Sequence, residues 1–282
     1  MRIDSTDDVT IALHDLGGEG PSVLVAHATG FCAGAYRPLT TPLAQEHRVW
    51  ALDFRAHGDS TRPEPERLGW SGMIDDVEAV VAAIGAETGE ASLLGFGHSM
   101  GGACLLGAEL RRPGTFRAIY AYEPITIPAS WGEGTGPNPL ADSARRRRGR
   151  FASRSEALAR YASRPPLGSF RADALWNYVE HGFAEVPGGN GEVELKCPPE
   201  HEAAVFQAPG KPRIDDLGAI SIPVVVALGE RDASPGPADF APDVAAALPN
   251  GELHRFAHLS HFGPFQDPDT LAADAEAHFA GR

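Results

Sequence analysis

A single serine lies among four glycines in residues 95–102, with the sequence GFGHSMGG. The apolar run ASLL precedes this segment and ACLLGAEL follows it, a pattern typical of a turn between a strand and a helix. The spacing Gly97-x-Ser99-x-Gly101 matches the G-x-S-x-G motif, in which a strained turn exposes the serine hydroxyl above the carboxyl edge of a sheet. The flanking glycines avoid collisions with neighbouring backbone, and the N-terminus of the next helix favours developing negative charge. We therefore interpret Ser99 as a nucleophile.

Other glycine-rich loops fit this segment less well. A phosphate-binding loop of the type G-x-x-x-x-G-K-[ST] needs a lysine, which is missing here. A dinucleotide-binding loop needs G-x-G-x-x-G, whereas Gly95, Gly97 and Gly101 are spaced one residue too long. A packing turn that is lined by glycine and does no chemistry is the remaining alternative.

A serine hydroxyl becomes a strong nucleophile only when a base takes its proton, and a third group must orient that base. In strand–helix proteins of this kind the partners follow the serine along the chain, first the acid and then the histidine. His261 lies in the loop between an expected strand, residues 251–257, and the last expected helix. That loop reaches the same sheet edge as the serine, so we favour His261 over His258 at the strand end and His254 within the strand.

Two carboxylates compete for the role of orienting acid. Asp232 follows the expected buried strand 222–229, and a side chain on that loop can reach the loop after the next strand. Glu123 ends the expected strand 116–123, which follows the helix after the nucleophile and stops at the same sheet edge. We favour Asp232 and keep Glu123 as the alternative acid.

An attacked carbonyl develops an oxyanion, which two backbone N–H groups should receive. One donor is expected from Met100, the residue after the nucleophile. The other is expected from the loop HATGF, residues 27–31, where the position favours Thr29. Phe31 and Phe262 adjoin this loop and the candidate base, so we expect both to line the substrate pocket.

Short apolar strands that alternate with amphipathic helices must position these residues. Residues 8–127 contain the expected strands VTIAL (at a sheet edge), SVLVAH, HRVWALDF, ASLLGF and FRAIYAYE, and the helices SGMIDDVEAVVAAIGA, with Ser71 as N-cap, and MGGACLLGAELRR. Residues 220–282 resume the alternation with IPVVVALG, DFAPDVAAALP, GELHRFA and DPDTLAADAEAHFA. This order predicts an α/β fold, in which a mostly parallel central sheet is flanked by helices on both faces.

Residues 128–213 lose the alternation. They contain the helical stretches SRSEALARYA and RADALWNYVEHGF and a turn-rich passage, so we expect a mostly helical cap inserted into a core domain of residues 1–127 and 214–282. Such a cap would form pocket walls and exclude water. The aromatic candidates to line it are Trp131, Phe151, Trp176, Tyr178 and Phe183, and for each of them the core of the cap is the more common place.

Four consecutive arginines, Arg145 to Arg148, lie within the expected cap. They could bind an anionic group of a substrate. Charge runs more often form a solvated helix face or pair with acidic surface, and we favour that interpretation.

Together these segments resemble the α/β-hydrolase fold superfamily, in its serine-nucleophile branch with a helical cap between two core strands. The resemblance covers essentially the whole chain and rests on HATGF, DFRAHGDS, GHSMGG, LGERD and HLSHFGPFQDP. It implies that Ser99 is the nucleophile, His261 the general base and Asp232 the orienting acid. It also implies that the N–H groups of Met100 and Thr29 are the oxyanion donors.

Two details of the resemblance concern residues outside this reaction centre. Ala28 stands where the motif HATGF more often has glycine. In DFRAHGDS, residues 53–60, the resemblance implies that Asp53, Arg55 and His57 hold a turn and do no chemistry.

Composition excludes several classes of partner. The 282 residues carry a formal net charge of −14, whereas nucleic-acid binding needs a basic face. No apolar stretch approaches the roughly 20 residues of a membrane span. Cys32, Cys104 and Cys197 are too widely spaced for a zinc site or a disulfide framework, so a reducing, cytoplasmic compartment is expected, with no metal and no cofactor. A small molecule is the expected partner, and monomer and homodimer both stay open.

Three functions fit these features. The first is a serine hydrolase that cleaves a small carboxylic ester, lactone or thioester through an acyl-enzyme. The second uses the same triad for hydrolysis of a carbon–carbon bond, or for a cofactor-free activity of the perhydrolase or haloperoxidase type. The third is a non-catalytic receptor that binds a small molecule beneath the cap.

Overall fold

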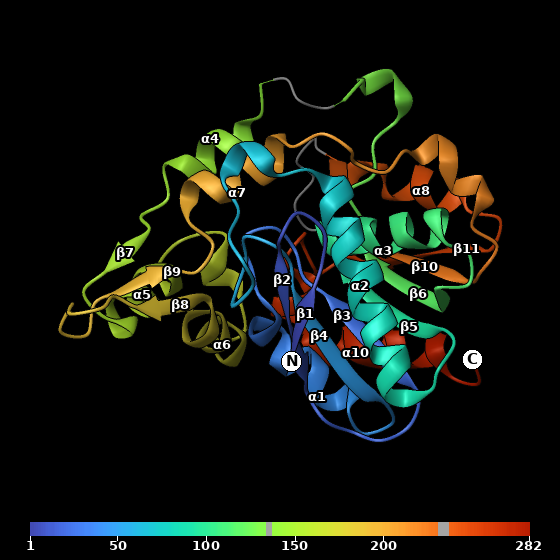
Figure 1. Cartoon of the computed structure of the whole chain (residues 1–282), viewed down its shortest axis with the longest axis horizontal. Helices are drawn as coiled ribbons and strands as arrows, with labels where there is room; N and C mark the ends of the chain where they lie inside the picture. The colour runs from blue at the N-terminus through green and yellow to red at the C-terminus, as the bar shows by residue number, and fades with distance from the viewer. Residues whose placement is uncertain (134–136, 231–236) are drawn as a thin grey trace.

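A computed structural model describes residues 1–133, 137–230 and 237–282 of the chain. Within these residues eight strands form one sheet in the order β1-β2-β4-β3-β5-β6-β10-β11 (Figure 1). All neighbours from β4 to β11 are parallel, and β1 and β2 pair antiparallel at one edge. The strands are β1 (Arg2–Asp4), β2 (Thr10–Asp15), β3 (Ser22–Ala26), β4 (Arg48–Asp53), β5 (Leu93–His98), β6 (Phe116–Tyr122), β10 (Val224–Gly229) and β11 (Gly251–Phe256).

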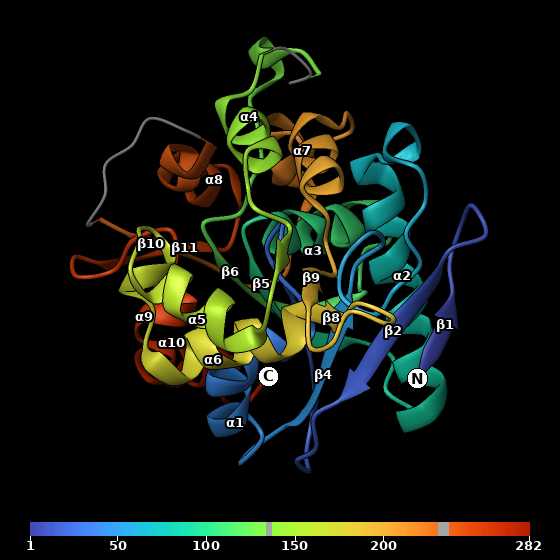
Figure 2. The same ribbon diagram turned by 90° about the vertical axis from the view of Figure 1, so that its left-hand side faces the viewer.

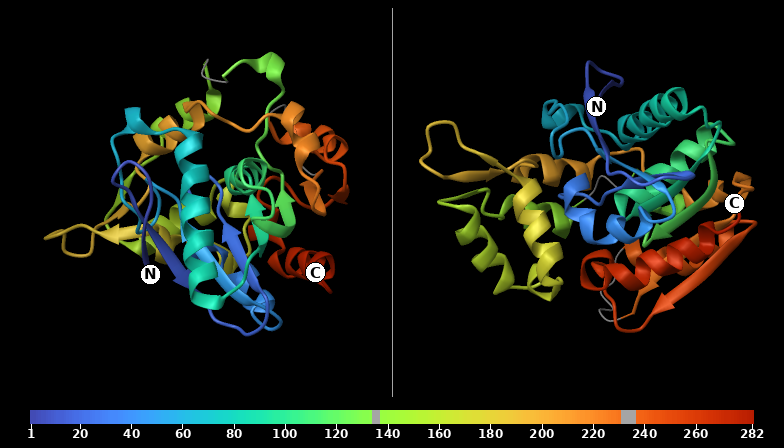
Figure 3. Two further views of the ribbon diagram at one scale, coloured as in Figure 1. Left: turned by 45° about the vertical axis from the view of Figure 1, so that its right-hand side comes forward. Right: turned by 90° about the horizontal axis from the view of Figure 1, so that it is seen from below.

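Helices cover both faces of this sheet, as predicted for an α/β fold. Helices α2, α3 and α8 pack on one face, and α1, α9 and α10 pack on the other (Figures 1 and 3). Their bounds are α1 (Arg37–Leu43), α2 (Trp70–Thr88), α3 (Met100–Arg111), α8 (Ala241–Ala247), α9 (Gly263–Gln266) and α10 (Pro268–Phe279). Short 3-10 helices are η1 (Ala33–Tyr36), η2 (Pro65–Arg67), η3 (Ala129–Trp131), η4 (Leu167–Ser169), η5 (Ile214–Ala219) and η6 (Pro237–Phe240). In the described residues no helix is both long and apolar enough to cross a membrane.

The core consists of two apolar layers, one on each side of the sheet. Successive residues of a strand face opposite sides, so Leu24 belongs to the layer under α2 and α3, while Val23 and Val25 belong to the layer under α1 and α10. All three are completely or almost completely buried. Burial on both faces explains why the parallel strands read as continuous apolar runs rather than as alternating patterns.

The chain leaves this sheet between β6 and β10. Within that excursion, residues 137–213 are called the insertion here, and Figure 2 shows them facing the viewer. It contains α4 (Pro139–Arg145), β7 (Arg150–Phe151), α5 (Arg154–Ala162), α6 (Ala172–Gly182), β8 (Phe183–Glu185), β9 (Val193–Leu195) and α7 (Pro199–Gln207). The strands form a small antiparallel sheet, β7-β9-β8, which the sequence did not predict because each strand has only two or three residues.

Two local predictions were wrong. The strand VTIAL corresponds to β2, which is not at the edge, because the N-terminal residues form β1 and pair with it. Helix α2 begins two residues earlier than expected, with Gly69 rather than Ser71 at its N-cap. The indole of Trp70 explains this start: it is buried and donates to the carbonyl oxygen of Val205, which anchors the first turn in the core.

Candidate active site

Ser99 occupies a strained turn between β5 and α3. Its backbone has φ 56° and ψ −116°, a conformation that L-residues rarely adopt. The turn requires small neighbours: a Cβ on Gly97 would lie 2.4 Å from the Cα of Gly102, and one on Gly101 would lie 2.1 Å from the carbonyl oxygen of Ala26. The Ser99 N–H donates to the carbonyl oxygen of Tyr122 at 2.9 Å, which ties the turn to the end of β6. The side chain is thereby held above the carboxyl ends of the parallel strands.

The hydroxyl of Ser99 is the first member of a hydrogen-bonded chain of three side chains. His261 Nε2 lies 3.2 Å from Ser99 Oγ, and His261 Nδ1 lies 2.6 Å from Glu123 Oε2. The second oxygen of Glu123 accepts the N–H of Gly229, the last residue of β10, at 2.8 Å. Because the carboxylate only accepts, Nδ1 carries the imidazole proton and Nε2 faces the serine as an acceptor.

The structure thus brings together Ser99, His261 and Glu123, which come from the ends of β5, β11 and β6. Glu123 is buried, whereas the side chain of His261 is 32 % exposed and opens toward a cavity. Asp232, the favoured acid in the sequence analysis, lies outside the described residues. Glu123 was the alternative, and its carboxylate is in direct contact with the imidazole. This geometry can move a proton from the serine to a histidine whose tautomer is fixed.

The two backbone amides that the sequence predicts as oxyanion donors belong to residues that contact each other, and one of them, Met100, directly follows Ser99. Thr29 and Met100 are both buried, and Thr29 Oγ1 lies 3.4 Å from Met100 Sδ, which places the two residues side by side. Met100 opens α3, so its N–H has no acceptor within the helix. Neither of the two N–H groups has an acceptor within the described part of the chain. They are available to a developing negative charge.

A tyrosine and a histidine that the sequence analysis did not single out connect the two loops of the site. The N–H of Ala28 donates to the hydroxyl of Tyr36 at 3.0 Å, and that hydroxyl lies 2.7 Å from Nδ1 of His98. On the other side of the ring, Nε2 of His98 lies 2.8 Å from the carbonyl oxygen of His261. Since a carbonyl only accepts, Nε2 donates and Nδ1 accepts from Tyr36. The bridge links the oxyanion loop to the loop that carries the base.

His57 holds the same oxyanion loop from another side. Its Nε2 accepts the N–H of Gly30 at 3.0 Å, and its Nδ1 lies 3.0 Å from the carbonyl oxygen of Arg55. Burial lowers the pKa of His57 to about 3 and also lowers the pKa of His98 and of His27. These rings are therefore neutral at pH 7 and act as fixed hydrogen-bonding groups. The motif DFRAHGDS supports the loop of Thr29 as well as its own turn.

Other charged groups are committed to structure. The described residues contain one grouping with metal-ligand spacing, His14, Asp53 and Asp59. The carboxylate of Asp53 already accepts the N–H of Ala33 at 2.7 Å and that of Asp59 at 2.9 Å, and it lies 3.0 Å from His14 Nε2. Although burial alone raises the pKa of Asp53, His14 and these bonds lower it to about 2. This grouping anchors the turn after β4.

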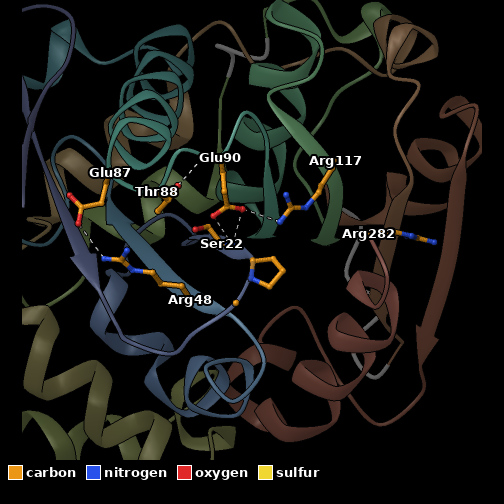
Figure 4. Close-up of a pocket in the computed structure, with 9 residues that line it drawn as sticks. Ser22, Arg48, Glu87, Thr88, Glu90, Arg117 and Arg282 are labelled. Carbon is orange, nitrogen blue, oxygen red and sulfur yellow. Dashed lines mark hydrogen bonds and ion pairs between the residues drawn. The ribbon is translucent and has the colours of Figure 1, made fainter.

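A hollow at the amino ends of the strands is lined by charged side chains that already pair with one another or with nearby residues (Figure 4). Glu90 accepts the N–H of Ser22 and a guanidinium N–H of Arg117, and Arg48 pairs with Glu87 and Asp15. These contacts join the starts of β3, β4 and β6. Ser99 lies at the opposite, carboxyl edge, so this hollow is separate from the site.

The cavity over Ser99 is about 350 Å³ and is walled by the insertion. Phe31 and Phe262 line it, together with Ser99, Thr29 and His261. Two residues from the insertion that were expected there by sequence, Phe151 and Tyr178, also line it, whereas Phe183 packs among them in the core of the insertion.

Trp131 and Trp176, by contrast, do not line this cavity. Trp131 is half exposed and packs edge-on against Phe240 near α8. Trp176 is equally exposed because it lies on the outer side of α6, opposite the buried Tyr178 and Val179. Of the two candidates on α6, Tyr178 therefore lines the cavity and Trp176 faces outward.

The chain belongs to a known family and is similar in sequence to several enzymes. The Alpha/beta hydrolase family matches residues 23–275. Human protein phosphatase methylesterase 1 is 35 % identical over 96 residues, which are 33 % of this chain and only 25 % of that protein. A non-heme chloroperoxidase of Streptomyces lividans is 27 % identical over 243 residues, 82 % of this chain and 81 % of that one.

Solved structures show the same fold. E-2-(acetamidomethylene)succinate hydrolase has a TM-score of 0.77 at 18 % identity, with 99 % of this chain and 97 % of that chain covered. A thermophilic esterase from Thermogutta terrifontis has a TM-score of 0.71 at 20 % identity, with 98 % and 96 % covered. At these identities the likeness concerns the architecture.

Proposed function

The chain is a hydrolase of the alpha/beta hydrolase family, and from this premise we propose that it cleaves a small carboxylic ester, lactone or thioester with Ser99 as nucleophile. The observation that carries the proposal is the hydrogen-bonded chain Ser99–His261–Glu123 at the base of a cavity. A hydroxyl, an imidazole and a buried carboxylate in this order are the parts that acyl transfer needs.

In the first half of the proposed reaction Ser99 Oγ attacks the carbonyl carbon while His261 Nε2 takes the hydroxyl proton. The negative charge that forms on the carbonyl oxygen is received by the N–H groups of Thr29 and Met100. Glu123 stabilises the imidazolium and keeps the ring in place. His261 then gives its proton to the leaving alcohol or thiol, and an acyl-enzyme remains on Ser99.

In the second half a water molecule replaces the leaving group. His261 takes a proton from this water, whose oxygen attacks the acyl carbon, and the same two N–H groups receive the charge. Collapse of the intermediate returns the proton to Ser99 Oγ and releases the acid. The proposed steps need only residues of this chain and water.

We assign the role of orienting acid to Glu123 rather than Asp232. Its support is twofold: the carboxylate contacts His261 Nδ1 at 2.6 Å, and the N–H of Gly229 holds its other oxygen. A positive φ of 44° at Glu123 turns the chain at the end of β6 and accompanies this orientation. In this proposal Asp232 has no part in proton transfer.

We further propose that residues 128–213 act as a cap on a core domain of residues 1–127 and 214–282. The support is the position of the insertion between β6 and β10 and its share in the cavity wall. A cap would exclude water from the acyl-enzyme except for the attacking molecule. The three cysteines are free and buried, which is compatible with a cytoplasmic protein.

A second candidate is a perhydrolase or haloperoxidase activity on the same triad. It is favoured by the similarity to the Streptomyces lividans non-heme chloroperoxidase, which extends over 82 % of this chain. Hydrogen peroxide would then replace water as the acceptor of the acyl group. Addition of peroxide to the ester assay separates the two, because a peracid forms only in the second case.

The test of the proposal is turnover of p-nitrophenyl acetate and labelling by a fluorophosphonate probe. We expect the wild-type protein to do both and the Ser99→Ala variant to do neither, since the variant lacks the nucleophile. Folded protein that is neither labelled nor active would contradict the proposal and favour a receptor that binds without chemistry.

A further inference from the structure

Five arginines line the cavity over Ser99: Arg146, Arg147, Arg148, Arg160 and Arg164. Among the lining residues that the structure describes, Glu202 is the one carboxylate. The arginines come from the segment that follows α4, from α5 and from the loop after α5, all within the insertion (Figure 2). Residues 139–171 hold nine arginines and two acidic residues, although the whole chain has a net charge of −14. Positive charge is therefore concentrated around the cavity over Ser99.

Two of the five arginines have carboxylate partners. Arg147 pairs with the buried Glu202 and donates to the hydroxyl of Tyr178, and this pair packs against Gly30 of the oxyanion loop. Arg148 donates twice to Glu156, at 2.7 and 3.1 Å. These contacts hold the insertion together and neutralise both guanidinium groups.

The other three are not neutralised in this way. Within residues 1–133, 137–230 and 239–282, Arg146 and Arg164 form no ion pair, and Arg160 has only a longer-range attraction to Glu156, whose two oxygens Arg148 already occupies. Surface arginines of this protein usually do have partners, as Arg145, Arg150 and Arg154 do next to them in sequence. The unpaired cations face a common cavity.

Apolar side chains form a large part of the remaining cavity wall. Phe31, Phe262, Leu167 and Phe206 contribute to it, and Phe31 packs against the buried Phe265 at 4.6 Å between ring centroids. Arg146 and Arg164 are exposed and Arg160 is half-buried, so their guanidinium groups are accessible to an anion at the edge of this apolar wall. A ligand that satisfies both parts of the wall has an apolar body and an anionic end.

We propose that the substrate is an ester or thioester that carries an anionic group, a carboxylate or a phosphate, and that Arg146, Arg160 and Arg164 bind this group. The inference rests on the proposed function of Ser99 and adds the class of substrate. Guanidinium groups suit both anions because their donors match two oxygens at once. The scissile carbonyl then lies at Ser99 while the anionic group lies among these three arginines.

The test compares two p-nitrophenyl esters with equally long acyl chains, the valerate and the mono-ester of glutarate, which differ only in a terminal carboxylate. We expect kcat/KM of the wild-type protein to be about tenfold higher for the glutarate ester at low ionic strength, and this preference to fall as salt is added. A third ester, of 4-phosphonobutyrate, shows whether a phosphate-type anion is preferred to a carboxylate.

Variants identify the residues. In Arg146→Gln, Arg160→Gln and Arg164→Gln we expect the ratio of kcat/KM, glutarate ester over valerate ester, to fall about tenfold. Arg150→Gln is the matched control, because Arg150 is an arginine of the same segment that pairs with Glu194 and does not line the cavity. Its ratio should stay at the wild-type value.

Two results would overturn the inference and leave the proposed function intact. The first is a preference of the wild-type protein for the valerate ester. The second is a ratio of kcat/KM that stays at the wild-type value in all three variants, as it does in the Arg150→Gln control. Absence of all esterase activity would contradict the proposed function instead. In that case calorimetric titration of the Ser99→Ala protein with glutarate and with phenyl phosphate decides the inference. Binding that is lost in Arg160→Gln supports it, and no binding of either anion refutes it.

Discussion

Replacement of Glu123 by glutamine tests the assignment of the acid with little change in shape. Oε1 of Glu123 accepts the N–H of Gly229 at 2.8 Å, and Oε2 accepts Nδ1–H of His261 at 2.6 Å. A glutamine there has one acceptor and one donor. If its oxygen stays on Gly229, its NH2 group faces Nδ1, which must then accept, so the ring proton moves to Nε2 and points at Ser99. The ring can no longer take the serine proton.

The opposite orientation of the glutamine is also unfavourable. Its NH2 group would face the N–H of Gly229, and two buried donors without an acceptor cost about 1–3 kcal/mol. The lost negative charge further destabilises the imidazolium in the transition state. In a serine-protease triad the equivalent Asp-to-Asn change lowers kcat about 10⁴-fold, or about 5.5 kcal/mol. We expect a loss of that order for Glu123→Gln.

The assay is kcat for p-nitrophenyl acetate, measured for Glu123→Gln and for Asp232→Asn as the matched control. A similar melting temperature of the two variants ensures that a loss of activity is not a loss of fold. The reasoning is refuted if Asp232→Asn causes the large loss and Glu123→Gln leaves kcat within a few-fold of wild type.

Three further predictions concern the supports of the site. The pKa of His57 is about 3 in the folded protein and near 6.5 in the unfolded chain, so the unfolded chain binds the proton first as the pH is lowered. The contribution of this ring to the free energy of unfolding therefore falls by about 1.4 kcal/mol per pH unit as the pH goes from 6.5 down to 3. Denaturant titrations should give a shallower pH slope for His57→Gln, and an equal slope would count against the prediction. Tyr36→Phe leaves the Ala28 N–H without an acceptor, so we expect about 1–3 kcal/mol lower stability and a lower kcat at similar KM; an unchanged kcat would show that the bridge does not position the loops. Gly101→Ala places a Cβ 2.1 Å from a carbonyl oxygen and should cost about 1–3 kcal/mol or prevent folding, whereas Gly69→Ala, with 3.6 Å to its nearest neighbour, should melt close to wild type.

The meeting of Ser99 and His261 could be predicted because it follows from topology. Both residues come directly after strands of one parallel sheet, and the carboxyl ends of such strands lie at one edge. The glycines beside Ser99 add a local signal, since their collisions with backbone depend only on the turn itself. No local signal separates the two acids. Glu123 and Asp232 follow neighbouring strands, and the contact of Glu123 depends on its positive φ and on the N–H of Gly229, 106 residues away along the chain.

Side chains that support the loops were beyond prediction for a related reason. A buried histidine that accepts an amide proton looks in sequence like any other histidine. His57 was interpreted as holding its own turn, and its contact with Gly30 of a different loop appears only when β3 and β4 are paired. Tyr36 lies in η1, an element that no apolar period marks. Its role depends on contacts with two separate segments at once.

The pattern of charged residues in the insertion predicted the pairing of its arginines only in part. The run of four was interpreted as a solvated or paired face, and Arg145, Arg147 and Arg148 do pair, with partners 55 residues away for Arg147 and eight for Arg148. Such pairing depends on the packing of α4 against α7 and on the turn before α5, which local sequence does not specify. The arginines left without carboxylates are dispersed over residues 146–164, so no run marks them. Topology alone brings the ends of β5, β6 and β11 to one edge of the sheet, whereas the pairing of the arginines in the insertion is decided only in the folded structure.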